Sequence, residues 1–207
     1  VRRNTKIVYI IENNGVYGLT KGQFSATADM GSGSKKGDVN EMIPIDCCGL
    51  ALELGCTFVA RSFSADMKQL TALLKAALHH NGTALLDVVS PCVTFNNHES
   101  STKSYKYAKD HEIPLHEIDF IEHVEPQAPV DIAAGEVRDI ELYDGSHIRL
   151  KKLADDYDPT DRLLAVNTIE KARRDSQFLT GLLYLDKTRR PFVEQCNLVD
   201  EPLFGLP

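Results

Sequence analysis

The sequence predicts an α/β fold, with part of a doubly wound parallel sheet followed by a C-terminal α+β extension. Short apolar runs alternate with segments in which apolar residues recur every three or four positions, as in amphipathic helices. Alternating strands and helices imply right-handed crossovers between parallel strands. From about residue 112 the pattern becomes more polar and richer in proline. We therefore predict a division of the chain into residues 1–112 and 113–207.

Five elements are expected in the first segment. The apolar run 7–11 predicts a buried strand, and residues 43–55 predict a short helix that ends at a glycine. A second strand follows at 57–60. Residues 64–80 have the apolar spacing of a capped amphipathic helix, which stops at an Asn-Gly pair. The continuous apolar run 84–89 predicts a third strand.

The second segment has a hairpin and a helix. Residues 140–150 alternate apolar and polar side chains on both sides of Asp144-Gly145, which is a strong hairpin signal. Residues 158–177 then predict a helix. We assign the tail, residues 180–203, to the same C-terminal extension.

Composition excludes several classes of protein. The 207 residues are 43% hydrophobic and 26% charged, as in ordinary globular proteins, and the formal net charge of −7 does not favour nucleic-acid binding. No apolar run approaches the roughly 20 residues that a membrane span requires. The five cysteines are an odd number and do not form a disulfide framework. We expect a protein of the cytoplasm.

A polar, glycine-rich loop follows the first strand directly. Loops at the carboxyl ends of parallel strands are common ligand sites. The amide oxygen of Asn14 is a hard neutral donor, and the backbone carbonyl of Val16 can point at the same Mg²⁺ ion. The competing interpretation is an ordinary strand-to-helix connection, in which the Asn-Asn-Gly sequence only forms a turn.

The loop resembles the second half of the thiamine diphosphate motif of the β subunits of 2-oxoacid:ferredoxin oxidoreductases. The resemblance rests on Asn14 and on Val16-Tyr17-Gly18-Leu19-Thr20-Lys21-Gly22-Gln23. It implies a thiamine diphosphate-binding fold in which Asn14 and Val16 hold Mg²⁺. In the family the motif opens with Gly-Asp-Gly, whose aspartate is a further ligand, and this chain does not contain that opening. We therefore expect the chain to be the C-terminal part of a longer subunit.

The same resemblance assigns the rest of the loop. Gly18, Leu19 and Thr20 are expected to shape it around the diphosphate through backbone contacts and the threonine hydroxyl. Lys21 has no acidic neighbour in sequence and can meet an anionic group as a point charge; alternatively, it is a solvated loop lysine. Family members with Gly-Leu-Thr-Lys-Gly-Gln at this place resemble those that use 2-oxoglutarate, so Lys21 is our candidate for binding the distal carboxylate.

A second resemblance to the same family lies at Pro91-Cys92-Val93-Thr94-Phe95-Asn96, after the strand 84–89. In the family this cysteine is one of four ligands of a [4Fe-4S] cluster. A lone cysteine cannot hold a cluster, because four thiolates are normally required. Cys92 is thus expected to be a ligand only in the intact subunit, and without the resemblance it would be a buried structural thiol.

The resemblance implies an enzyme that is active only with upstream sequence and a partner α subunit. Thiamine diphosphate would support decarboxylation of a 2-oxoacid, coenzyme A would accept the acyl group, and the cluster would pass electrons to ferredoxin. The favoured substrate is 2-oxoglutarate, with pyruvate or branched 2-oxoacids as alternatives. Two other functions stay open, namely a thiamine diphosphate-dependent decarboxylase or synthase without a cluster, and a non-catalytic assembly module.

Overall fold

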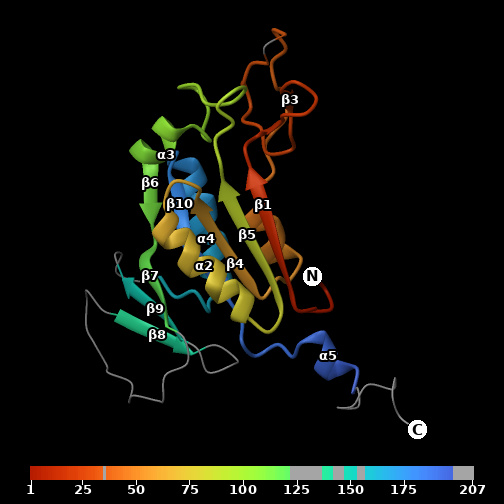
Figure 1. The fold of residues 1–207 in the computed structure, drawn as a ribbon, viewed down its shortest axis with the longest axis vertical. Coiled ribbons are helices and arrows are strands. Elements are labelled where there is room, and N and C mark those ends of the chain that lie inside the picture. The colour runs from red at the N-terminus through yellow and green to blue at the C-terminus, as the bar shows by residue number, and fades with distance from the viewer. Residues whose placement is uncertain (35, 122–136, 142–146, 153–156, 198–207) are drawn as a thin grey trace.

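The computed structural model describes residues 1–34, 36–121, 137–141, 147–152 and 157–197, and its main sheet has five strands within these ranges. The strand order is β1-β5-β4-β10-β6 (Figure 1). The strands are β1 (Ile7–Asn13), β4 (Phe58–Phe63), β5 (Thr83–Val89), β6 (Glu112–Pro114) and β10 (Phe178–Leu185). β1, β5 and β4 are parallel, as the sequence predicts. β10 is antiparallel to β4 and makes the sheet mixed.

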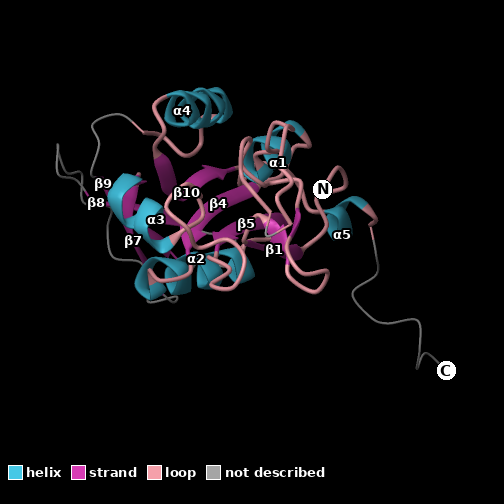
Figure 2. Cartoon of the chain, turned by 90° about the horizontal axis from the view of Figure 1, so that it is seen from above, coloured by secondary structure: helices cyan, strands magenta, loops and turns pink. Residues whose placement is uncertain are grey.

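Helices cover both faces of this sheet (Figure 2). Helices α1 (Cys47–Glu53) and α4 (Arg162–Arg174) lie on one face, where Leu52, Ile169 and Leu183 are part of one core. Helix α2 (Met67–His79) covers the other face, with Leu73 and Leu86 in a second core. Two shorter helices are α3 (Tyr105–His111) and α5 (Phe192–Gln195). This layering is the α/β architecture that the sequence predicts.

Aspartates set the starts of three helices. α1 begins four residues later than predicted because the Asp46 side chain accepts from the Gly49 amide at 2.8 Å. The cap of α2 is Asp66, which accepts from the Gln69 amide at 3.0 Å, and the cap of α4 is Asp161. An aspartate oxygen satisfies an amide that has no partner within the first turn, so each helix starts just after its cap.

The second segment contributes to two sheets. β7 (His116–Ile121), β9 (His147–Lys152) and β8 (Val137–Glu141) form an antiparallel sheet, which confirms the strands of the predicted hairpin. Its Asp144-Gly145 turn and the tail beyond residue 197 lie outside the described residues. β10 also comes from this segment, yet it pairs with β4 of the first. The division at residue 112 stays a prediction. The main sheet contains strands from both sides of it, because β10 lies beyond residue 112 and β4 lies before it.

The loop after β1 contains a small hairpin that the sequence did not predict, formed by β2 (Val16–Tyr17) and β3 (Gln23–Phe24). Two residues per strand are too few to show any periodicity. Within the described ranges, no helix has the length and apolar character to cross a membrane.

Candidate cofactor site

The candidate site lies at the carboxyl ends of β1, β5 and β4. Two loops gather beyond these ends (Figure 1): the cofactor loop, residues 14–46 after β1, and the cysteine loop, residues 90–104 after β5. Both loops emerge at the same edge because β1 and β5 run parallel and in register from Ile7 against Thr83 to Asn13 against Val89. The sheet thus brings together the two segments that the sequence singled out.

Asn14 forms a tight turn at the start of the cofactor loop. Its side-chain oxygen accepts a hydrogen bond from the Val16 amide at 3.0 Å, and Val16 then pairs with Phe24 in the β2-β3 hairpin. An amide oxygen has two lone pairs, so one remains for a ligand. Asn14 and Val16 are therefore held next to each other, and the donor set suits a hard cation such as Mg²⁺.

The tip of the hairpin is open to solvent. The Lys21 amide donates to the Gly18 carbonyl at 3.0 Å, and the Thr20 hydroxyl donates to the Tyr17 carbonyl at 3.2 Å. Leu19 is 99% exposed, and no atom lies within 4 Å of where a side chain at Gly18 would begin. A ligand therefore has free access to this part of the backbone.

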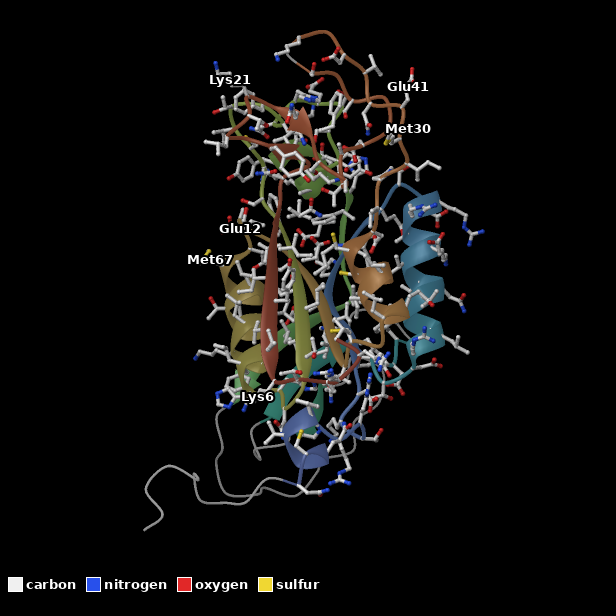
Figure 3. All side chains as sticks on the ribbon, turned by 90° about the vertical axis from the view of Figure 1, so that its right-hand side faces the viewer. Lys6, Glu12, Lys21, Met30, Glu41 and Met67 are labelled. Carbon is white, nitrogen blue, oxygen red and sulfur yellow. The ribbon has the colours of Figure 1, made fainter. Side chains whose placement is uncertain are left out.

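Lys21 lies at the outer end of the hairpin, where Figure 3 labels it. Its φ of +67° is in the left-handed region, which few side-chain-bearing residues adopt. It lines a surface pocket of ≈ 250 Å³ with Lys36, Ser34 and Asp38. The residues that line the pocket thus include two lysines and one aspartate, a set that can attract an anionic substrate group.

Cys92 lies in a compact turn after β5. Its carbonyl accepts from the Phe95 amide at 3.2 Å and from the Asn96 amide at 2.8 Å, and the residue is half-buried. In the described part of the chain no three His, Cys, Asp or Glu side chains gather as a metal site. Cys92 is therefore a single thiol there, and a [4Fe-4S] cluster needs three more ligands.

The two loops are bonded directly to each other. The Asn96 side-chain amide donates to the Asn14 carbonyl at 2.7 Å. Deeper in the structure, the Asp29 carboxylate accepts from the Thr102 amide and hydroxyl at 2.9 and 2.6 Å, and from the Lys103 ammonium at 2.9 Å. The structure therefore places Asn14, Val16 and Cys92 in one connected unit, while Gly18, Leu19, Thr20 and Lys21 project from it.

A charged network below the loops escaped the sequence analysis. Arg61 on β4 donates to Asp87 on β5 and to Asp46 at the start of α1, each at 2.8 Å, and the Asn13 amide donates to Asp87 at 2.9 Å. Burial opposes ionisation of Asp46, but Arg61 and the amides of α1 lower its pKa. The available signal was a charged residue inside each of two apolar strands, because such a charge needs a buried partner.

Cys47 lines a cavity of ≈ 230 Å³ beside this network. Burial and the carboxylates of Asp87 and Asp46 raise the pKa of its thiol to about 11. The thiol therefore stays protonated at neutral pH and is not an activated nucleophile. Among the described residues every buried side-chain nitrogen and oxygen has a hydrogen-bond partner, so the network leaves no buried polar side-chain atom unpaired at the strand ends.

Two family models match the chain. One, described as "Thiamine pyrophosphate enzyme, C-terminal TPP binding domain", matches residues 1–88 and so includes the whole hairpin. The other describes the C-terminal region of the pyruvate ferredoxin oxidoreductase beta subunit and matches residues 140–201. They lie on either side of the predicted division. The first includes the cofactor loop, whereas the cysteine loop at residues 90–104 lies outside both matched ranges.

Curated relatives of the chain are named as 2-oxoacid:ferredoxin oxidoreductase or 2-oxoglutarate synthase subunits. A 2-oxoacid:ferredoxin oxidoreductase subunit beta of Saccharolobus solfataricus is 44% identical over 107 residues, which are 50% of this chain and 34% of the relative. The 2-oxoglutarate synthase subunit KorB of Methanocaldococcus jannaschii is 32% identical over 145 residues, or 68% of this chain and 53% of the relative. The chain thus matches from about a third to about half of the length of these relatives.

A solved structure agrees in fold. It is a 2-oxoglutarate:ferredoxin oxidoreductase of Magnetococcus marinus with 2-oxoglutarate, coenzyme A and succinyl-CoA bound. The match has a TM-score of 0.66 at 24% identity and covers 94% of this chain and 52% of that one. In sequence and in fold, the chain is thus related to the β subunits of 2-oxoacid:ferredoxin oxidoreductases, as the cofactor and cysteine loops predicted.

Proposed function

We propose that the chain is the C-terminal part of the β subunit of a 2-oxoglutarate:ferredoxin oxidoreductase. With upstream sequence and an α subunit, it would convert 2-oxoglutarate and coenzyme A to succinyl-CoA and CO₂, and pass a pair of electrons singly to ferredoxin. The observation that carries the proposal is the Asn14 turn, which lies inside the region matched by the thiamine pyrophosphate model and is bonded to the cysteine loop.

The residues of the cofactor loop fit a magnesium diphosphate. Asn14 and Val16 would hold Mg²⁺, since the amide oxygen keeps a free lone pair and Val16 is fixed beside it. Gly18, Leu19 and Thr20 would shape the loop around the diphosphate, which their exposure allows. Bound thiamine diphosphate supplies the nucleophilic carbon and the electron sink for decarboxylation. The part of this chain is to anchor and orient its diphosphate end.

Lys21 would bind the distal carboxylate of 2-oxoglutarate. It is exposed at the end of the hairpin and shares its pocket with a second cation, Lys36. An ammonium is a compact charge that suits a carboxylate at the end of a flexible substrate. The relatives whose names specify 2-oxoglutarate support this choice of substrate.

Cys92 would be one of the four cluster ligands in the intact subunit. It is half-buried and unbridged, so its sulfur is free to bind a metal. Cytoplasmic localisation is part of the proposal, because the five cysteines are free and the cytosol keeps thiols reduced.

The test is anaerobic reduction of ferredoxin or a viologen dye by the full-length β subunit with its α partner. Coenzyme A is supplied with 2-oxoglutarate, pyruvate or a branched 2-oxoacid in parallel. We expect reduction that depends on coenzyme A and is fastest with 2-oxoglutarate. No reduction by a complex that contains iron and thiamine diphosphate would overturn the proposal.

A further inference from the structure

Asn96 bridges the two loops of the candidate site. We propose that it is a positioning residue, which holds the Asn14 turn in the shape that binds Mg²⁺, with Phe95 supporting the other end of the same hairpin. The cysteine loop would then set the geometry of the magnesium site besides supplying a cluster ligand. This inference rests on the proposed function, because it concerns the site where thiamine diphosphate would bind.

The bonds of Asn96 run in two directions. Its backbone amide donates to the Cys92 carbonyl at 2.8 Å, and its side-chain amide donates to the Asn14 carbonyl at 2.7 Å. Only 5% of the residue is exposed, so water does not easily replace either bond. Asn96 thus joins the Asn14 carbonyl, which its side chain binds, to the turn that contains Cys92, which its backbone binds.

Gly15 makes this bond possible. A β-carbon at this position would lie 2.7 Å from the Asn96 side-chain nitrogen, well inside van der Waals contact. Gly15 also has a φ of +72°, a conformation that glycine adopts without steric cost. The backbone next to the proposed magnesium ligand is therefore shaped to receive the Asn96 amide.

Phe95 supports the opposite end of the hairpin. A β-carbon at Gly22 would lie 2.8 Å from Cδ1 of the Phe95 ring, so the ring packs directly on the backbone there. Gly22 follows Lys21 and has a φ of +92°. Two consecutive residues of the cysteine loop therefore contact the two ends of the hairpin that carries the cofactor residues.

A separate anchor keeps the cysteine loop in place. The ion pair between Lys103 and Asp29 joins the two loops farther along the chain, and the side chains are only 11% and 14% exposed. Loss of the Asn96 side chain should therefore release the Asn14 carbonyl without detaching the loops. Groups that orient metal ligands typically change metal affinity about 10- to 100-fold when removed.

The experiment uses the intact β subunit with its α partner. Asn96→Ala removes the amide, and Asn96→Leu removes it while keeping much of its volume. The matched control is Asn97→Ala, because exposed Asn97 bonds to the Tyr105 amide at 3.1 Å, outside the hairpin. For each complex we measure the Mg²⁺ concentration that half-saturates thiamine diphosphate binding, the iron content and the electron paramagnetic resonance spectrum of the reduced cluster.

We expect Asn96→Ala and Asn96→Leu to raise the half-saturating Mg²⁺ concentration about tenfold or more. Iron content and the cluster spectrum should match the wild type, and Asn97→Ala should behave as the wild type in all three. Unchanged Mg²⁺ dependence in an assembled variant would overturn this inference and leave the proposed function intact. So would a loss of iron in step with Mg²⁺ affinity, because that indicates general loosening. A wild-type complex that binds no thiamine diphosphate would overturn the proposed function as well.

Discussion

Arg61 on β4 donates a hydrogen bond from its Nε atom to the buried carboxylate of Asp87 on β5 at 2.8 Å. The Asp87 side chain is only 1% exposed, and the same guanidinium also binds Asp46. The pair thus joins two neighbouring strands and the start of α1 at the end of the sheet that carries the candidate site.

Replacing Arg61 should destabilise the fold strongly. Arg61→Ala leaves the Asp87 carboxylate buried without its cation, which typically costs about 3–5 kcal/mol in the free energy of unfolding. Urea unfolding followed by circular dichroism measures the change. Arg173→Ala is the control, because this arginine is 54% exposed in a surface pair, and its midpoint should stay near the wild type. Equal shifts for both variants would refute the special role of Arg61.

Replacing Lys21 should change substrate preference. Lys21→Ala removes the cation proposed for the distal carboxylate, and a hydrogen bond to a charged group is worth about 1.5–3 kcal/mol, or about 10- to 150-fold in kcat/KM. We expect this loss for 2-oxoglutarate, and little change for pyruvate, which has no distal carboxylate. Lys36→Ala serves as the comparison, since it removes the other cation of the pocket. Equal losses for the two substrates in Lys21→Ala would exclude the proposed role.

Replacing Cys92 should remove the cluster. In the complex with Cys92→Ser we expect lower iron content, loss of the cluster spectrum and loss of electron transfer to ferredoxin, because serine does not replace a thiolate ligand well. Cys196→Ser is the matched control, because this free cysteine is exposed and lies at the end of α5. Full iron content in Cys92→Ser would favour the cluster-free alternative.

Acid should weaken the fold partly through His80. Burial lowers the pKa of His80 to about 4, and its ring is hydrogen-bonded to Thr57 at 2.8 Å. Protonation is easier in the unfolded chain, so the contribution of neutral His80 to the free energy of unfolding is complete above about pH 6.5 and is lost as the pH falls towards 4. The loss amounts to about 2 kcal/mol by pH 5.

The comparison is between the wild type and His80→Gln, by urea unfolding at pH 7 and pH 5. The variant should lose about 2 kcal/mol less on acidification, because it has no imidazole to protonate. His98→Gln is the control, since His98 is exposed. A variant with the same pH dependence as the wild type would show that His80 does not contribute.

A side chain at Gly22 should be costly, and one at Gly18 should not. Gly22→Ala places a methyl group 2.8 Å from the Phe95 ring at a φ of +92°, and backbone strain of this kind costs on the order of 1–3 kcal/mol. Gly18 has open space and no left-handed φ, so Gly18→Ala should leave the unfolding midpoint nearly unchanged. Thermal unfolding measures both, and a similar midpoint for the two variants would contradict the packing of Phe95 on Gly22.

The sequence by itself determined the elements whose signals are local. The apolar runs at β4 and β5 are continuous because both faces of these parallel strands are covered, and the three-to-four-residue spacing marks α2 and α4. The prediction that the run 7–11 is a buried strand was right about the strand and wrong about its burial, because β1 is at the edge of the sheet and Ile7, Tyr9 and Ile10 are 53%, 60% and 49% exposed. Boundaries were less accurate, since whether Asp46 or an earlier residue caps α1 depends on where the chain turns. The resemblance that led to the family was also local, because it lay in two loops.

The tertiary structure alone decided how distant segments meet. β10 joins the sheet antiparallel to β4, although more than a hundred residues separate them in the chain, and no local pattern specifies such a partner. The bonds of Asn96 to Asn14 and of Arg61 to Asp87 likewise join side chains far apart in sequence. Hydrogen bonds and ion pairs depend on positions in space, whereas periodicity reports only which face of its own element a residue occupies.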